Sequence, residues 1–463
     1  MFYSHALAVE FKYIRFKGIK MKKLNSGACG SLRTVLFLIL GILTIEPDRL
    51  HAGEIEVASA LDGYTIAGHS ADGMVFIGEK DAKHYRIFAD GSKLVAELEI
   101  PIFVGFDNGN NSKNQTSIKA INAISNNGTT VFGVAEGFGV QYHYYWKESG
   151  TELKSKKDSN VLSQSIACNG TGEYYFSTEK NKLSVYSAGS KVKDLQVANI
   201  AGSSIYLSSI SKTGNLIVGN STIGGVKKAV FWNNWKSNNQ AIALSSHLVS
   251  KNINIPSTTT LVSSHYISKN ENYLAGEAYS SSKGKKLAYI ASMGFGSKKA
   301  DIAYIDEVKT WDVQTKALGS NTSLGAIPTG GSEAGNITIK GVSADGNIAV
   351  GNWEHSTVTG ENYGFIWFKN KEISLNDGTT QIGFAMKFDD YLKMEDIALA
   401  NGKTFEITKI LGLTEDGNYI TCQGTLDGNY TTFEVAVPEP ASMTILLTAS
   451  LALLRKRRKK KAC

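Results

Sequence analysis

The sequence predicts an all-β protein, built as an approximately seven-bladed β-propeller of repeated antiparallel meanders. Three observations predict this architecture. Glycine is abundant, with 46 residues, and proline is scarce, with 6. A turn motif that ends in Asp-Gly or Asn-Gly recurs between short apolar runs. An aromatic segment follows most copies of that turn. Short strands joined by polar turns are typical of all-β folds, so we expect a core of many small sheets.

The turn motif defines a repeat that runs along the whole middle of the chain. Its clearest copy covers residues 342–351, with the sequence VSADGNIAVG. Further copies cover residues 69–78, 124–133, 210–219, 267–276 and 413–420, the last without its closing glycine in register. A degraded seventh copy begins at residue 166, with Gly170 as its turn glycine and two extra residues before Tyr174. Recurrence at this scale is typical of repeat architectures.

Each copy predicts a small meander. The Asp-Gly or Asn-Gly pair predicts a tight hairpin turn, because both residues tolerate positive φ and the Asp or Asn side chain can cap the turn. The strand after it closes with a glycine, which leaves room for a neighbouring backbone. We expect Trp146, Trp232 and Trp367, in the aromatic second strands, to pack between blades. Residues 372–375 are an example of the third strand. Such a meander cannot bury its own face, so it needs neighbours.

The spacing of the repeats predicts the number of blades. Successive turns lie 42 to 75 residues apart. The shorter spacings fit one four-stranded blade, and the longer ones require insertions, of which a short helix over residues 389–400 is one. A strand at 54–58 is expected to complete the sheet that ends with residues 432–436. A distorted open β-solenoid is the alternative architecture.

The repeat resembles the bacterial extracellular HAF-type repeat, in which an S-x-D-G turn and a Val-x-Gly strand precede an Ala-Phe-x-Trp strand. Residues 229–232 (AVFW) and 363–367 (YGFIW) match the second part, whereas the copy around Cys168 departs from it. The resemblance implies secretion and a repeat architecture. The resemblance implies no enzymatic reaction and no catalytic residues.

The first 52 residues are predicted to be a leader and signal peptide. Met21, Lys22, Lys23 and Arg33 precede an apolar run over residues 35–45, and small residues follow it at 52–53. A positive start, a short apolar centre and a small-residue exit are the layout of a secretory signal. The run is short for a membrane span. A retained N-terminal anchor is the alternative, and Met21 is a candidate for the true start.

The last 27 residues, 437–463, carry the most specific pattern of the chain. Pro438, Glu439 and Pro440 precede an apolar segment over residues 443–454, which is predicted to form a short transmembrane helix. A run of seven cations that stops translocation follows: Arg455, Lys456, Arg457, Arg458, Lys459, Lys460 and Lys461. This order closely resembles the PEP-CTERM sorting signal of Gram-negative bacteria. The resemblance implies that an exosortase-type membrane transpeptidase recognises residues 438–440 and releases or transfers the protein to the cell surface. A plain C-terminal tail anchor is the alternative.

The excess of positive charge lies in the two terminal segments of the chain. The formal net charge is +7. Without residues 1–52 and 438–463, which together hold 15 basic and 4 acidic residues, the body has 34 basic and 38 acidic residues. A nucleic-acid partner is therefore not expected. Only Cys168 and Cys422 lie in the body, which excludes a disulfide framework and leaves one bridge as the alternative to two free thiols.

No residue pattern in the body predicts catalysis, a cofactor or a metal site. His69, Ser70 and Asp72 lie close together, but Ser and Asp recur in copies without the His, which favours a turn. Asp107, with the turn acids Asp72, Asp345 and Asp416, could supply oxygen ligands to calcium, although no bidentate acid stands at EF-hand spacing. Three further aromatic residues are candidates for stacking on carbohydrate if they are exposed: Tyr142, Tyr144 and Trp353.

These patterns together predict an exported, non-enzymatic protein of the cell surface or extracellular matrix. Its expected partners are the inner membrane and the transpeptidase during export, and an extracellular polysaccharide afterwards. One alternative is a secreted propeller-type carbohydrate-active enzyme, which needs two carboxylates together at the mouth of the central tunnel. Another is a calcium-dependent adhesion module.

Overall fold

A computed structural model of the chain describes the following residues: 55–57, 61, 63–70, 75–88, 96–98, 116–125, 127–137, 140–147, 150–151, 166–179, 182–187, 190–196, 205–268, 270–296, 299–315, 317–320, 336–354, 362–395, 397, 405–414 and 416–437. All of them belong to one unit, Leu50–Cys463. The predicted signal peptide and sorting signal lie outside the described residues.

The described part is all-β, with its strands in seven small sheets. Sheet 1 contains β2 (Thr65–His69), β3 (Val75–Lys80), β4 (Lys83–Phe88) and β5 (Ala96–Glu97). Sheet 2 contains β6 (Thr116–Ile124), β7 (Thr130–Gly137), β8 (Val140–Lys147) and β9 (Gly150–Thr151). Sheet 3 contains β10 (Ile166–Cys168), β11 (Tyr174–Glu179), β12 (Lys182–Ser187) and β13 (Ser190–Leu195).

The next two sheets follow the same plan, and a helix lies between them. Sheet 4 contains β14 (Ile205–Ile210), β15 (Leu216–Ile223), β16 (Val226–Asn233) and β17 (Ile242–Ala243). Helix α3 (Leu244–Ser250) follows it and buries Leu244 and Leu248. Sheet 5 contains β18 (Thr259–Ile267), β19 (Tyr273–Ser280), β20 (Lys285–Ser292) and β21 (Asp301–Ile305).

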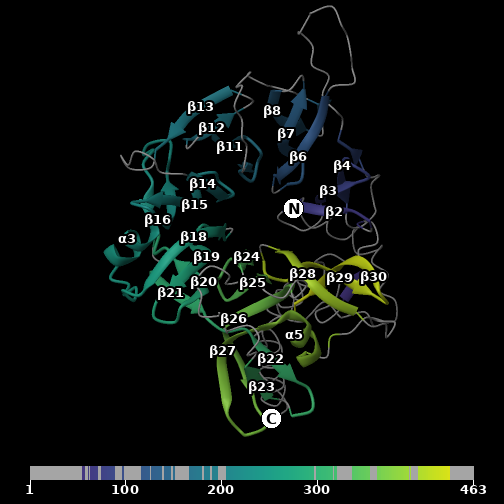
Figure 1. Cartoon of the computed structure of the whole chain (residues 1–463), viewed down its shortest axis with the longest axis vertical. Coiled ribbons are helices and arrows are strands. Elements are labelled where there is room, and N and C mark those ends of the chain that lie inside the picture. The colour runs from purple at the N-terminus through teal and green to yellow at the C-terminus, as the bar shows by residue number, and fades with distance from the viewer. Residues whose placement is uncertain are drawn as a thin grey trace, which may run out of the picture. The chain divides into compact units, whose positions relative to one another are not determined.

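The last two sheets carry additions to this plan. Sheet 6 contains β24 (Asn336–Val342), β25 (Ile348–Glu354), β26 (Asn362–Ser374) and β27 (Thr380–Lys387), extended by β22 (Lys309–Asp312) and β23 (Ala317–Ser320) next to β27 (Figure 1). Helix α5 (Phe388–Met394) connects it to sheet 7. Sheet 7 contains β28 (Phe405–Leu413), β29 (Tyr419–Leu426), β30 (Asn429–Ala436) and β1 (Ile55–Val57).

The predicted pairing of the first and last strands of the body is confirmed. Strand β1 pairs antiparallel with β30, with Ile55 opposite Val435 and Val57 opposite Phe433. The N-terminal strand thus completes the sheet formed by the C-terminal strands.

Seven apolar clusters of described residues hold the sheets against one another. Six of these clusters each lie between two sheets that follow one another in the sequence, from sheets 1 and 2 to sheets 6 and 7. The seventh joins Ile66, Phe76 and Ile87 of sheet 1 to Leu411 of sheet 7. Burial of apolar area at about 25 cal/mol per Å² is the main stabilising term here, and it acts between sheets because neither face of one sheet is covered by the sheet itself.

The tryptophans of the aromatic strands lie in these clusters, as predicted. Trp146 lies between sheets 1 and 2, Trp232 between sheets 3 and 4, and Trp367 between sheets 5 and 6. Trp353 is buried in the same cluster as Trp367, so it does not meet the condition of exposure for stacking on carbohydrate. The side chains of Tyr142 and Tyr144 lie outside the described part.

The first strand of each sheet contacts the first strand of the next. These contacts join β2 to β6, β6 to β10, β10 to β14, β14 to β18, β18 to β24 and β24 to β28, and β28 also contacts β2. The last contact is close, because a Cβ added at Gly412 of β28 would lie 1.8 Å from Nε2 of His69 in β2.

The recurring turn is held by a buried side chain at its start. In the copy at 342–351, the Ser343 hydroxyl donates to Asp345 Oδ1 (2.6 Å) and accepts from the Ile348 N–H (3.0 Å). The same acceptance, from the N–H five residues further on, occurs at all seven turns, whose first residues are Ser70, Ser125, Asn169, Ser211, Ser268, Ser343 and Thr414. This side chain satisfies a strand N–H that would otherwise be buried without a partner.

The predicted turn geometry needs two corrections. Both central residues were expected to take positive φ, but in the described Asp-Gly turns of the repeat only the glycine does, at Gly346 (φ 73°) and Gly417 (φ 82°). The carboxylate of Asp345 instead accepts hydrogen bonds from Ser343 and the Asn347 N–H. In the third copy the turn glycine is Gly172, not Gly170. Its N–H donates to Asn169 O, because Asn169 takes the place of the serine.

The closing glycine lies where another backbone passes, as predicted. A Cβ at Gly276 would lie 1.9 Å from Ser263 O, and a Cβ at Gly219 would lie 2.0 Å from Tyr206 O. In sheet 7 the buried Cys422 stands at the closing position, and Gly424 meets Glu406 O two residues further on. The glycine is needed because the facing first strand contains a β-bulge, which turns a carbonyl toward it.

Two element boundaries differ from the prediction. The helix expected at 389–400 is α5, which spans only Phe388–Met394. Ile397 lies beyond the end of the helix but still packs in the core. The strand expected at 372–375 is the end of β26, which continues past a register shift between Phe368 and Glu372 and pairs with β27.

Candidate functional site

The residues predicted to direct sorting lie beyond the described part of the chain. Pro438, Glu439 and Pro440 follow Val437, the last described residue, and the stop-transfer residues 455–461 lie further on. Among the described residues, no helix has the length and apolar character needed to cross a membrane. The candidate site of the described part is therefore a cavity in the β body.

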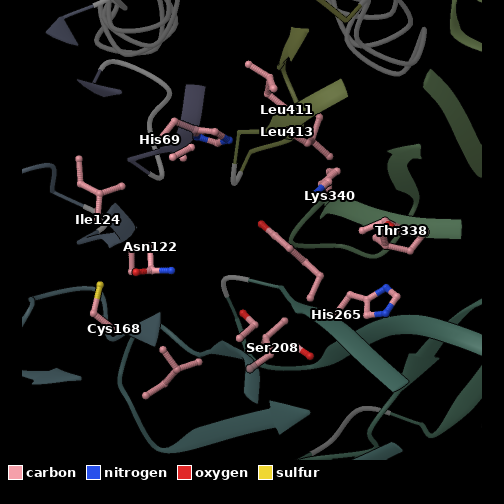
Figure 2. A pocket seen from close by; sticks show the side chains of 18 of the residues that line it. His69, Asn122, Ile124, Cys168, Ser208, His265, Thr338, Lys340, Leu411 and Leu413 are labelled. Carbon is pink, nitrogen blue, oxygen red and sulfur yellow. The ribbon is translucent and has the colours of Figure 1, made fainter. Parts of the chain in front are cut away.

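That cavity is lined by the first strands of the sheets. Its volume is about 490 Å³, and all seven first strands, β2, β6, β10, β14, β18, β24 and β28, contribute residues to its wall. Figure 2 shows His69, Asn122, Ser208, His265 and Lys340 around one common space. A volume of this size lies within the ~300–1,000 Å³ of small-ligand sites.

One bulged residue from each of six sheets lines the cavity. The register shifts in the first strands leave nine residues unpaired. Six of them each stand three positions before the first residue of their turn: Ala67, Asn122, Ser208, His265, Lys340 and Leu411. All six line the cavity. A bulge re-aims the side chain of its extra residue, so the repeat carries a position whose side chain differs from sheet to sheet. Sequence analysis missed this position, although its fixed distance from the turn is a usable signal.

The described lining is polar and positively charged. It contains Lys212, Lys340, His69 and His265, and it contains no Asp or Glu. This contrasts with the body of the chain, where acidic residues outnumber basic ones. The cavity is therefore more suited to an anion than to a cation.

His265 has an incomplete set of hydrogen bonds. The Ser263 hydroxyl and His265 Nε2 share a hydrogen bond of 2.7 Å, whereas Nδ1 is buried and has no hydrogen-bond partner among the described residues. Burial, together with the nearby charges of Lys340, Lys227 and Lys286, lowers the pKa of His265 to about 4. The ring is neutral at pH 7, so one of its nitrogens carries a proton.

Ser263 and His265 do not form an activated nucleophile. A serine is activated by a base that a third group orients, and the ideal pKa of that base lies near the working pH. The acid opposite Ser263, Glu277, instead pairs with Lys286 at 3.7 Å. With a pKa of about 4, His265 is too weak a base to take the serine proton at neutral pH.

The His69, Ser70 and Asp72 segment is a turn in its described part. The Ser70 hydroxyl is buried and accepts from the Val75 N–H (2.9 Å), and His69 Nδ1 contacts Ser70 O (2.7 Å). Ser70 thus has the same role as the first residue of every other turn. Asp72 lies outside the described residues.

The other two turn acids stabilise their own turns. Asp345 and Asp416 each accept a hydrogen bond from the first residue of their turn and from the N–H two residues further on. Both border a second cavity of about 580 Å³ between sheets 6 and 7, where Glu395 pairs with Lys371. Within the described part, no three His, Cys, Asp or Glu residues are placed to hold a metal ion. Asp107 lies outside that part.

The two cysteines of the body are free thiols. Cys422 is buried in the core between sheets 6 and 7, and Cys168 is half-buried at the wall of the 490 Å³ cavity. The single bridge left open by the sequence is therefore not formed.

Comparisons with known proteins assign no family. No family model matches the chain, and no curated protein matches it. Among solved structures, the putative TolB from Agrobacterium tumefaciens is similar at 14% identity and a TM-score of 0.33, over 52% of this chain and 79% of that one. A chain of the mitotic checkpoint complex is similar at 13% identity and a TM-score of 0.41, over 90% of this chain and 98% of that one.

Proposed function

We propose that the described body is a seven-bladed β-propeller. Its seven first strands touch in sequence order, and β28 also touches β2. The pairing of β1 with β30 supports the same architecture, since a ring is commonly closed by a strand from the opposite terminus. The alternative, an open β-solenoid, would separate sheet 1 from sheet 7.

We propose further that the protein is exported, processed at residues 438–440 and presented at the cell surface or in the extracellular matrix, where it has a structural or binding role. Export is supported by the order of the C-terminal segment, which resembles a PEP-CTERM signal. A role without catalysis is supported by one observation above all: the seven first strands border one cavity, and its described wall holds no carboxylate.

The alternative of a propeller-type carbohydrate-active enzyme has less support. Glycoside hydrolysis commonly needs a pair of carboxylates about 5 to 10 Å apart at the reacting bond. The turn acids Asp345 and Asp416 are engaged in their own turns. Neither lines the cavity between the first strands.

Mass spectrometry of the secreted or surface-exposed protein tests the proposed export. We expect a new N-terminus near residue 53 and the loss of residues 455–461. The double variant Pro438→Ala, Pro440→Ala should retain the basic tail, whereas the control Pro256→Ala, in a surface loop of the body, should be processed normally. An intact tail on the surface form of the wild type would refute processing.

A further inference from the structure

The described body ends in the wall of the cavity between sheets 6 and 7. Val437, the last described residue, lines this cavity, its side chain is buried, and its N–H donates to Asn418 O (2.7 Å). The body therefore holds the chain in place up to the residue before Pro438. Three residues span at most about 11 Å of extended chain, so a protein that binds residues 438–440 must come within that distance of Val437.

The cavity next to Val437 is acidic. Its described wall holds four carboxylates, those of Asp345, Glu372, Glu395 and Asp416. The only cation among the described lining residues is Lys371, and it is paired with Glu395. The other three carboxylates therefore carry negative charge that no lining cation balances.

These three carboxylates are accessible to a partner. Asp345, Glu372 and Asp416 are all exposed, and none of them forms an ion pair with a described residue. The hydrogen bonds of the two aspartates come from neutral groups of their own turns. Surfaces of one sign of charge attract partners of the opposite sign and accelerate their association.

A basic protein surface fits this rim better than a lipid surface does. The apolar segment over residues 443–454 begins six residues after Val437, and six residues span at most about 22 Å. With that segment in a membrane, the rim would lie close to the bilayer. Bilayers that contain anionic lipids attract basic segments, which this rim is not.

We propose that Asp345, Glu372 and Asp416 form a docking rim for the membrane protein that processes residues 438–440, and that this partner meets the rim with a basic surface. The inference rests on the proposed processing. It adds that the processing protein binds the folded body as well as the motif, so that the rate of processing depends on charges outside residues 438–463.

Pulse-labelling of the producing cells, followed by mass spectrometry of the full chain, measures how fast residues 455–461 are lost. The double variant Glu372→Gln, Asp416→Asn removes two charges of the rim. We expect its loss of the tail to slow about tenfold, the low end of the effect of focused charge on association rates. Raising the ionic strength around spheroplasts should slow the wild type and leave this variant almost unchanged, because salt screens exposed charges.

The double variant is designed to keep the fold. Asparagine is compatible with the turn, because Asn270 stands at the same position in sheet 5 and accepts the same hydrogen bond from the first residue of its turn. The control Glu173→Gln, Asp312→Asn removes the same kinds of charge from exposed positions outside the cavity, and it should lose the tail at the wild-type rate. The thermal unfolding midpoint checks that both double variants are folded.

A second variant keeps the test valid if Asp416→Asn unfolds the protein. Glu372 is exposed and has no described partner, so Glu372→Lys should leave the fold intact and slow the loss of the tail more than Glu372→Gln does. Loss of the tail at the wild-type rate by these folded variants would overturn the inference alone. Faster loss would also overturn it, because the rim would then bind and shield the chain's own basic tail, residues 455–461. A wild type that keeps its tail would refute the proposed processing, and the inference with it.

Discussion

At the residue scale, the first side chain stabilises each turn, and the residue two positions later is Asp or Asn in most copies and Thr in two of them, Thr171 and Thr213. Ser343 donates to Asp345, and Ser268 donates to Asn270 in the same way (2.9 Å). The turns at Ser343 and Ser268 therefore differ in whether the acceptor of this hydrogen bond is charged or neutral. Hydrogen bonds to a charged acceptor are stronger than those to a neutral one, which makes the Asp turns sensitive to pH.

Replacing Asp345 should reveal this sensitivity. Burial alone would raise the pKa of Asp345, but hydrogen bonds from Ser343 and Asn347 outweigh it and hold the pKa below its usual value. Its stabilising contribution is thus complete above the unfolded-state pKa of about 3.9 and is lost as the pH falls through the lower pKa of the folded state. We expect the difference in unfolding free energy between the wild type and Asp345→Asn to shrink as the pH falls from about 5 to 3, measured by denaturant titration. A constant difference across that range would contradict this role.

At the scale of elements, the turns of neighbouring sheets pack on one another. A Cβ at Gly346 would lie 2.4 Å from the Tyr273 ring of the preceding sheet, and a Cβ at Gly128 would lie 2.7 Å from Val75. Stacked turns therefore fix how closely successive sheets approach at this end of their strands.

Two glycine variants separate this packing from backbone strain. Gly346 and Gly378 both take positive φ in an Asp-Gly turn, but nothing lies within 4 Å of a Cβ at Gly378. We expect Gly378→Ala to cost about 1–2 kcal/mol, the price of a non-glycine residue in the left-handed region. Gly346→Ala should cost clearly more, because the turn must also move away from Tyr273. Thermal unfolding of both variants measures the difference, and equal losses would exclude stacking as a stabilising contact.

Much of this element-level organisation could be predicted from the sequence, and the failures have identifiable causes. The turns, the packing tryptophans and the pairing of β1 were visible because they depend on residue types at fixed spacing. Helix α3 was missed because its N-cap, Ala243, offers no side-chain cap and its first turn has no acidic residue. The end of β26 has the pattern of a separate strand because Lys369, Asn370 and Lys371 interrupt its apolar residues.

The candidate site was harder to predict than the fold. A β-bulge adds one residue to one strand without changing the residue types around it, so Asn122, His265 and Lys340 look like ordinary strand positions. Their common wall depends on which first strands lie together, and that is a property of the assembled sheets. The serine three residues later marks the position but says nothing about which side chain will stand there.

At the scale of the whole molecule, β1 is the element on which sheet 7 depends for its outer edge. Removing it exposes the unpaired N–H and C=O groups of β30. We expect a chain that begins at residue 61 to unfold at a lower temperature than one that begins at residue 51, and to aggregate more readily. Scanning calorimetry with light scattering measures both effects. If the two chains behaved alike, the pairing of β1 with β30 would have no part in stability.

The same pairing determines how the body would respond to tension. Ile55 at the start of β1 lies opposite Val435 near the end of β30, so the two ends of the body leave from one end of the same pair of strands. A force pulling those ends apart would load the hydrogen bonds between β1 and β30 one after another, as in a zipper, and not all at once in shear. A tether at the C-terminal end alone would spare the β1–β30 pair, because no force would then pull on the N-terminal end of β1.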